Sequence, residues 1–239
     1  MLTDDQFKNY CVIKTFGLKR SDIAQYLKTG SISVDYSEEC LDGTILVLNK
    51  DAEEVEFNRT LDMINAAFAD KIYADEDCSI AKKLVDACRE KGIRLIVAES
   101  ITGGMICSAI VDVPGASEVL SEGLVTYTNA SKVRRLHVKL STLETYGAVS
   151  KETAGEMARG LMENRDVDLG IATTGCAGPD SDEKGTPVGL AYVGISTRRG
   201  GKIYRLNLTG DRNYLRKCVA NAAMFYALKS IENADKENK

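Results

Sequence analysis

The sequence predicts a layered α/β domain over residues 76–239, preceded by a small α+β domain over residues 1–75. From Ser79 onward, segments of helical period alternate with short runs of branched apolar residues, a pattern typical of helices layered on a sheet. The polar stretch 73–79 has the composition of a linker between the two parts. The formal charge changes there as well, from −6 over the first part to +2 over the second.

The small domain is expected to contain two helices and two strands. Ser21 is predicted to cap a helix over residues 20–29, while residues 31–37 and 43–50 have the alternation and the branched side chains of strands. Helical spacing in residues 55–72 predicts the second helix. Its apolar face is Phe57, Leu61, Ile64 and Phe68.

The larger domain is expected to alternate between strands and helices. The predicted helices are residues 79–92, a helix beginning near Thr102, and residues 130–136, 150–166 and 213–231. The predicted strands are residues 93–100, 123–129, 168–175, 189–197 and 202–210, the last two as a neighbouring pair. Gly92 and Ser150 supply end signals for two of the helices, and the charged tail after Ile231 is expected to fray.

Composition limits the chemistry that this sequence can support. The seven cysteines include no C-x-x-C pair, so we expect reduced thiols, and His137 is the single histidine. We therefore expect no metal site, no cofactor and no Ser-His-Asp triad. The first residues lack the features of a signal peptide, and no long apolar run exists, which favours a cytoplasmic protein without membrane contact. The acidic first domain argues against a nucleic-acid partner.

Three predicted strands end in hydroxyl residues, glycine or amide: at Ser100 to Gly104, at Tyr127 to Asn129, and at Thr173 to Gly178. Ligand sites of open α/β sheets lie beyond such strand ends. Ser100 is a candidate nucleophile there, although Ser100 or Thr102 could instead cap the next helix.

Without a usable histidine, the base for Ser100 would be a lysine. Lys132 lies one helical turn after the second strand end, and burial would have to lower its pKa from about 10.4 toward 7–8. The alternative is an ordinary solvated lysine. Tyr127 could orient Lys132 or donate to an oxyanion, or it could lie in water, and Arg212 could meet a phosphate or stay on the surface.

Several spaced motifs occur here in one order: "AESITGG", "VPGAS", "GLVTYTNASKVRRLHV", "GAVSKETAGEMA", "DLGIATTGCAGP", "PVGLAYVGI" and "GDR". Together they resemble the C-terminal domain of the CinA family over about residues 77–232. Residues 10–75 look like the KH-like middle domain of longer CinA proteins. No counterpart of their large N-terminal molybdopterin-binding-like domain is present, so we expect no ADP-ribose pyrophosphatase activity.

The resemblance implies a nicotinamide-nucleotide amidase that converts nicotinamide mononucleotide to nicotinate mononucleotide and ammonia, in pyridine nucleotide salvage. It implies Ser100 as nucleophile, Lys132 as base and Tyr127 as a catalytic partner. The implied substrate-binding residues are Thr102, Gly103, Gly104, Asn129, Thr174, Gly175 and Arg212. A homo-oligomer is expected.

The sequence also departs from the family pattern. Ile101 stands where a cysteine is common, and residues 180–186 replace a glycine-rich loop that usually carries a lysine before the proline. The acids of this loop are expected to oppose an anionic nucleotide. A nucleotide-binding regulatory protein with weak or lost turnover is therefore the alternative function. A nucleic-acid binder is disfavoured, since "GLKR" replaces a GXXG loop.

Overall fold

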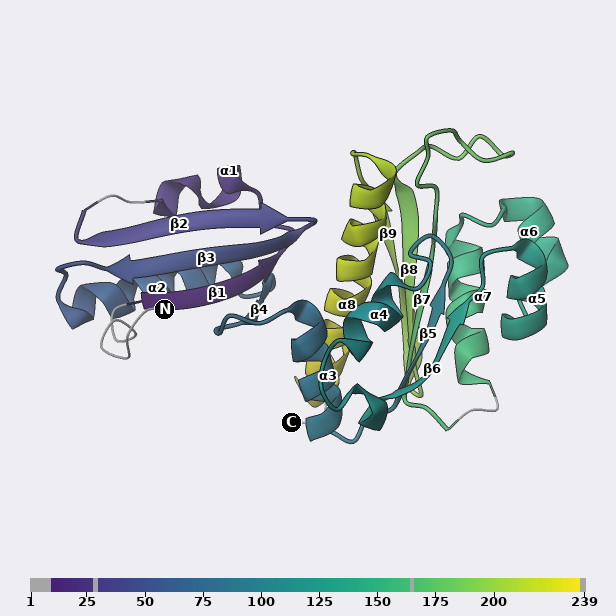
Figure 1. Ribbon diagram of the computed structural model, residues 1–239, viewed down its shortest axis with the longest axis horizontal. Coiled ribbons are helices and arrows are strands. Elements are labelled where there is room, and N and C mark those ends of the chain that lie inside the picture. Colours follow the sequence, from purple (N-terminus) through teal and green to yellow (C-terminus); the bar gives the residue numbers. More distant parts are fainter. Residues whose placement is uncertain (1–9, 28–29, 164–165, 237–239) are drawn as a thin grey trace. The chain divides into compact units, whose positions relative to one another are not determined.

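The computed structural model describes residues 10–27, 30–163 and 166–236 (Figure 1). Contacts divide the chain into two compact units, Met1–Ile80 and Ala81–Lys239. The division falls at Ile80, within the first turn of a helix, rather than at the expected residue 75. Each unit combines helices with a sheet, which confirms the predicted α/β class.

The first unit is a four-stranded sheet of order β2-β3-β1-β4 with every pair antiparallel. Its elements are β1 (Tyr10–Phe16), α1 (Arg20–Ile23), β2 (Ile32–Glu39), β3 (Asp42–Asn49), α2 (Glu54–Phe68) and β4 (Ile72–Ala74). The α2 helix buries Ile64 and Phe68 in the same apolar core as Ile45 and Val47 of the inner strand β3.

Two strands of this unit were not predicted. In β1, "YCVIKTF" begins beside polar residues and carries Lys14 and Thr15, and β4 is only three residues long. The expected cap at Ser21 is wrong: Lys19 is the N-cap of α1, and its backbone N–H donates to Asp22 Oδ2 at 2.9 Å.

The expected linker is also part of the folded unit. Tyr73 is buried, and its hydroxyl donates to Asp42 Oδ1 at 2.7 Å, where linker residues would be solvated. Sequence composition alone did not reveal this because "YADEDCS" is mostly polar.

The second unit is built on a mixed five-stranded sheet of order β6-β5-β7-β8-β9. Its strands are β5 (Leu95–Glu99), β6 (Leu120–Val125), β7 (Leu169–Gly175), β8 (Leu190–Thr197) and β9 (Gly200–Asn207). The β5 strand is parallel to β6 and β7, whereas β8 is antiparallel to both of its neighbours. The carboxyl ends of β5, β6 and β7 therefore meet at one edge of the sheet.

Helices cover both faces of this sheet (Figure 1). The α3, α4 and α8 helices lie on one face, and α5, α6 and α7 lie on the other. Their bounds are α3 (Ile80–Glu90), α4 (Met105–Val111), α5 (Asn129–Leu136), α6 (Leu140–Tyr146), α7 (Lys151–Met162) and α8 (Arg212–Lys236). As predicted, Ser150 caps α7, accepting a hydrogen bond from the Thr153 N–H.

Three details of this unit differ from the sequence expectation. The α6 helix was not predicted, because "LSTLETY" is short and lacks a cap with a side-chain bond. The α4 helix begins at Met105 rather than near Thr102. The α8 helix is buried on more than one face and continues past Ile231 to Lys236, while the tail beyond it lies outside the described residues.

Within residues 10–27, 30–163 and 166–236, no helix combines the length and the apolar character needed to cross a bilayer. Over the same described residues, no three His, Cys, Asp or Glu side chains gather as metal ligands would.

Candidate active site

A cavity of about 250 Å³ lies at the edge where the carboxyl ends of β5, β6 and β7 meet. It is lined by Ser100, Ile101, Tyr127, Lys132, Ala148, Val149, Thr174, Gly175, Cys176, Ala177, Gly178, Asp180, Ser181, Asp182 and Arg212. Six of the residues proposed from the sequence are thus brought to one cavity. They are Ser100, Tyr127, Lys132, Thr174, Gly175 and Arg212.

Ser100 and Lys132 form the centre of this cavity. Ser100 follows the last residue of β5, and its backbone N–H donates to Thr173 O of β7 at 3.1 Å. Lys132 is in the first turn of α5, a helix capped by Thr128, whose hydroxyl accepts from the Ser131 N–H. Lys132 Nζ lies 2.9 Å from Ser100 Oγ.

The side chain of Lys132 is shielded from solvent by its surroundings. Lys132 is 1% exposed, and its Nζ also donates to the carbonyls of Thr126 at 2.9 Å and Tyr127 at 3.2 Å. Burial lowers the pKa of Lys132 from 10.5 to about 8. A neutral amine has two N–H donors, which suit the two carbonyls, and one lone pair, which is then left for the Ser100 proton. The contacts of Lys132 are thus those of a lysine able to act as a base.

Glu99, which sequence reasoning missed, controls the turn that follows Ser100. Its side chain is fully buried and accepts three backbone hydrogen bonds from the start of α4. The donors are the N–H groups of Gly104 at 2.8 Å, Ile106 at 3.1 Å and Cys107 at 2.9 Å. An acid directly before a strand-end serine, with glycines shortly after it, was the available signal.

This capping occupies the backbone donors at the start of α4. Neither Ser100 nor Thr102 caps α4 with its side chain, and the Gly104 N–H is bound by Glu99 rather than open to a ligand. Gly103 and Gly104 have φ of +59° and +104°, a left-handed backbone that glycine adopts readily. These glycines and Thr102 shape the turn, and none of them lines the cavity.

Thr102 connects the turn to the central strand. It is fully buried, and its hydroxyl is 2.8 Å from the hydroxyl of Thr173. At the end of the same strand, Thr174 donates to Ala148 O at 2.6 Å, which holds the segment between α6 and α7 against the cavity. A Cβ on Gly175 would lie 2.7 Å from Ala191 and Ile101 side chains, so close packing requires glycine there.

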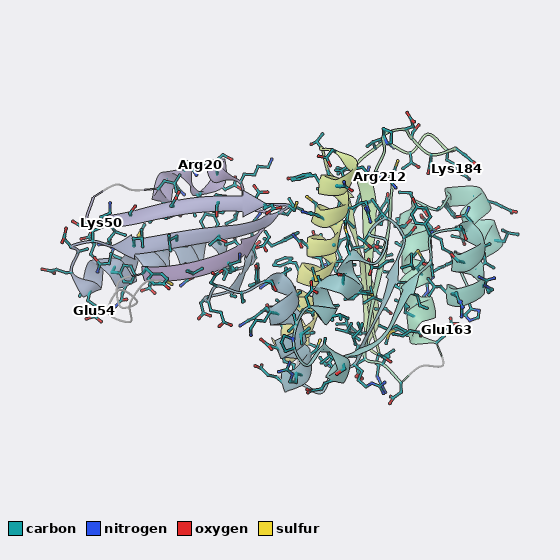
Figure 2. The ribbon with its side chains drawn as sticks, viewed as in Figure 1. Arg20, Lys50, Glu54, Glu163, Lys184 and Arg212 are labelled. Atoms are coloured by element: carbon teal, nitrogen blue, oxygen red, sulfur yellow. The ribbon has the colours of Figure 1, made fainter. Side chains whose placement is uncertain are left out.

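Arg212 and Tyr127 form the outer wall of the cavity. Arg212 donates to Gly178 O at 2.6 Å and to the Tyr127 hydroxyl at 3.2 Å. Figure 2 places Arg212 at the start of α8, at the same end of the second unit as Lys184 and opposite to Glu163. Tyr127 is 59% exposed, and the atom that contacts Lys132 is its backbone carbonyl rather than its hydroxyl.

The acidic loop, residues 180–186, reaches the cavity. Asp180 and Asp182 line it, whereas Glu183 does not. Burial would raise the pKa of Asp182, but hydrogen bonds from Thr186 and Lys184, with the Lys184 charge, lower it overall. Asp182 accepts from the N–H groups of both residues and from the Thr186 hydroxyl, so it also organises its own loop.

Asn129 and His137 lie outside the cavity. Asn129, expected to bind substrate, is an exposed residue that opens α5 and does not line the cavity. Its place just after the β6 exit made it plausible from the sequence, but the chain has already turned into the helix there. His137 is the exposed C-cap of α5.

Comparison with known proteins gives a consistent result. The sequence pattern of the CinA C-terminal domain matches residues 77–231. A competence-damage inducible protein of Clostridium acetobutylicum is 36% identical over 231 residues, which is 93% of this chain and 56% of that protein. A CinA-like protein of Fusobacterium nucleatum is 46% identical over 142 residues, covering 59% of this chain and 34% of that protein. The chain thus spans about half or less of these relatives.

Solved structures are similar to this chain over somewhat less than two thirds of its length. A competence/damage inducible protein from Agrobacterium tumefaciens is 33% identical, with a TM-score of 0.60, over 63% of this chain and 93% of that one. A CinA superfamily protein from Klebsiella pneumoniae is 28% identical, with a TM-score of 0.62, over 64% of this chain and 96% of that one.

Proposed function

Since the chain belongs to the CinA C-terminal domain family, we propose that it is an amidohydrolase that deamidates nicotinamide mononucleotide to nicotinate mononucleotide and ammonia. The observation that carries this proposal is the 2.9 Å contact between Lys132 Nζ and Ser100 Oγ inside the cavity. A serine beside a buried amine of lowered pKa is a nucleophile with its base.

The proposed reaction proceeds through an acyl-enzyme. Ser100 Oγ attacks the carboxamide carbon while its proton passes to Lys132, and the carbonyl oxygen becomes an oxyanion. When the tetrahedral adduct collapses, the C–N bond breaks and Lys132 returns the proton to the leaving amine, which departs as ammonia. Water, deprotonated by Lys132, then attacks the ester, which releases the carboxylate product and restores Ser100.

The cavity offers a place for each end of this substrate. Arg212 is the cation on the outer wall, where a guanidinium can bind the phosphate with two hydrogen bonds. The ring would lie against the β7 exit at Thr174 and Gly175, with its amide at Ser100. No metal ion or cofactor takes part in the proposed steps.

Ammonia release from nicotinamide mononucleotide tests the proposal. Wild-type protein should release ammonia and nicotinate mononucleotide in equal amounts, and Ser100→Ala should release neither. Ser181→Ala is a matched control, because Ser181 also lines the cavity but contacts no proposed base. Folded wild-type protein that yields no ammonia at millimolar substrate would refute the proposal.

The reaction should depend on the protonation of Lys132. Only the neutral amine accepts the serine proton, so kcat/KM should rise with pH and level off above the lysine pKa of about 8. Below that pH it should fall about tenfold per unit. A pH profile of initial rates checks this, and a flat profile between pH 6 and 9 would contradict the assigned base.

Asp180 and Asp182 favour a second candidate, a regulatory protein that binds the nucleotide with little turnover. Two carboxylates in the same cavity as Arg212 weaken the attraction for a phosphate. Nucleotide-dependent thermal stabilisation without product would support this function over the amidase.

A further inference from the structure

A second cavity, of about 510 Å³, lies within the second unit at the other end of strand β7. The first residue of β7, Leu169, lines it, whereas Thr174 and Gly175 at the end of that strand line the active-site cavity. The α8 helix likewise starts at Arg212 in one cavity and reaches the other with Ile231. Among the described residues, none lines both cavities. The volume of the second cavity is typical of small-molecule sites.

Apolar side chains from four elements line this second cavity. Leu169, Ile195 and Ile231, from β7, β8 and α8, are buried there. Tyr204 of β9 lines it as well, and its ring is stacked on that of Tyr226, with centroids 3.7 Å apart and an interplanar angle of 2°. Apolar side chains beside a ring that is held in place offer a surface on which a flat apolar ring can pack.

Positive charges surround the mouth of the second cavity. Lys91, Arg198, Arg199 and Lys202 line it and are exposed residues, so their charged ends can meet solvent. Asp168 is the one acid among the described residues that line it. Four positive charges therefore face one negative charge, which favours an anionic ligand.

Asp168 is already bound by partners of its own. Arg198 Nε lies 3.0 Å from Asp168 Oδ1, and the backbone N–H of Arg94 donates to Asp168 Oδ2 at 3.0 Å. Arg198 also lies 3.0 Å from Asp166 Oδ1 through its Nη2. These contacts use Arg198 and both oxygens of Asp168, so the other three cations of the cavity are in excess.

Lys202 places one of these charges beside the aromatic ring. Its Nζ lies over the Tyr204 ring, 5.1 Å from the centroid. Over the residues that the structure describes, no carboxylate is within ion-pair distance of this ammonium. A cation beside an aromatic ring and without an acid partner suits an anion that is attached to a ring.

The turn between β8 and β9 places Arg199 at the same mouth. The Arg199 N–H donates to the Thr197 hydroxyl at 3.2 Å, and that hydroxyl donates to Gly200 O at 3.0 Å, so the turn is held by its own hydrogen bonds. Two-residue turns of this kind usually contain glycine, asparagine or aspartate. Both residues here are arginines, and turn geometry does not account for them.

We propose that the second cavity binds an aromatic ring that carries a phosphate, which is the chemistry of a mononucleotide. The ring packs against the apolar wall beside Tyr204, and the phosphate accepts hydrogen bonds from Arg199 and Lys202 at the mouth. This binding site is independent of the proposed amidase reaction, because its residues are separate from those of the active-site cavity.

NMR titration with adenosine monophosphate (AMP) tests where such a ligand binds. In ¹⁵N-labelled wild-type protein, millimolar AMP should shift the amide resonances of residues 198–204. Shifts there support the proposal whether or not residues 174–178 of the active-site cavity respond too. Shifts confined to residues 174–178, or no shifts at all, overturn it.

Variants of the two cations test which groups hold the phosphate. Lys202→Ala and Arg199→Ala should each weaken AMP binding about tenfold, the scale of one hydrogen bond to a charged group. Arg205→Ala is the matched control, because Arg205 is an exposed cation of the same strand that does not line the cavity. The affinities are taken from the resonances of residues 198–204. Wild-type affinity in both cation variants overturns the proposal.

Two fragments of the probe test whether ring and phosphate are both recognised. Adenosine lacks the phosphate and inorganic phosphate lacks the ring, so each should bind at least tenfold more weakly than AMP at residues 198–204. Inorganic phosphate that binds as tightly as AMP would reveal a general attraction for anions and overturn the proposed site. Adenosine that binds as tightly as AMP would overturn the role of the cations and, with it, the proposed ligand class.

Discussion

Replacement of Lys132 with arginine is expected to lower kcat for amide hydrolysis about 10²–10⁴-fold, the usual contribution of a general base. Arginine keeps the positive charge but cannot lose its proton in the working pH range. Its larger head would also have to fit a site where Lys132 is 1% exposed and touches Ser100 Oγ and two carbonyls. Lys132→Ala should fail to a similar degree.

The comparison of the two variants decides what Lys132 does. If it is the base, both proteins lose kcat while each still binds nucleotide, measured by equilibrium titration beside Ser100→Ala. Substantial turnover by Lys132→Arg would mean that the lysine supplies charge only, and the Ser100–Lys132 pair would no longer explain the chemistry. Lys139→Arg, on an exposed residue that caps α6, is the matched control.

Glu99→Ala is expected to lower the free energy of unfolding by about 3 kcal/mol, because one buried and two partly buried backbone donors lose their acceptor at once. For a domain of this size, that corresponds to a fall in Tm of roughly 6–12 °C. Glu99→Gln keeps one acceptor oxygen and should lose less. Thermal unfolding followed by circular dichroism measures both.

Glu90→Ala serves as the control for this experiment. Glu90 is exposed at the last residue of α3, and its removal should change the free energy of unfolding by less than about 0.5 kcal/mol. A Glu99→Ala protein with unchanged Tm would show that the start of α4 does not depend on its capping carboxylate.

Much of the candidate site was accessible from the sequence because its residues lie at strand exits. Ser100 directly follows β5, and Thr174 is the penultimate residue of β7, both buried strands whose composition marks them clearly. Lys132 lies in the first turn of the helix that follows β6. Glu99 and Arg216 were not found, because their roles depend on where their side chains reach. Arg216 donates a hydrogen bond to the backbone carbonyl of Thr102, which lies 114 positions earlier in the chain, and no local sequence pattern indicates such a contact.

The fold shows the same distinction between local and distant information. The long helices α7 and α8 and the buried strands β5 and β7 have strong local patterns, and all four were predicted. The short elements β4 and α6 were missed, since elements of this length form mainly through tertiary packing. Asn129 was expected to bind substrate because of its position in the sequence. It is instead the first residue of α5 and does not line the cavity.

The buried lysine also links catalytic competence to the pH dependence of folding. The pKa of Lys132 is about 8 in the folded protein against an ordinary value of 10.5, so between these values the unfolded chain binds more protons. Titration of Lys132 does not reduce the free energy of unfolding above about pH 10.5. As the pH falls from there toward 8, this titration lowers the free energy of unfolding by on the order of 3 kcal/mol in total. At neutral pH the buried Lys132 therefore lowers the stability of the folded protein. An apolar side chain of similar size at this position would make the protein more stable but catalytically inactive.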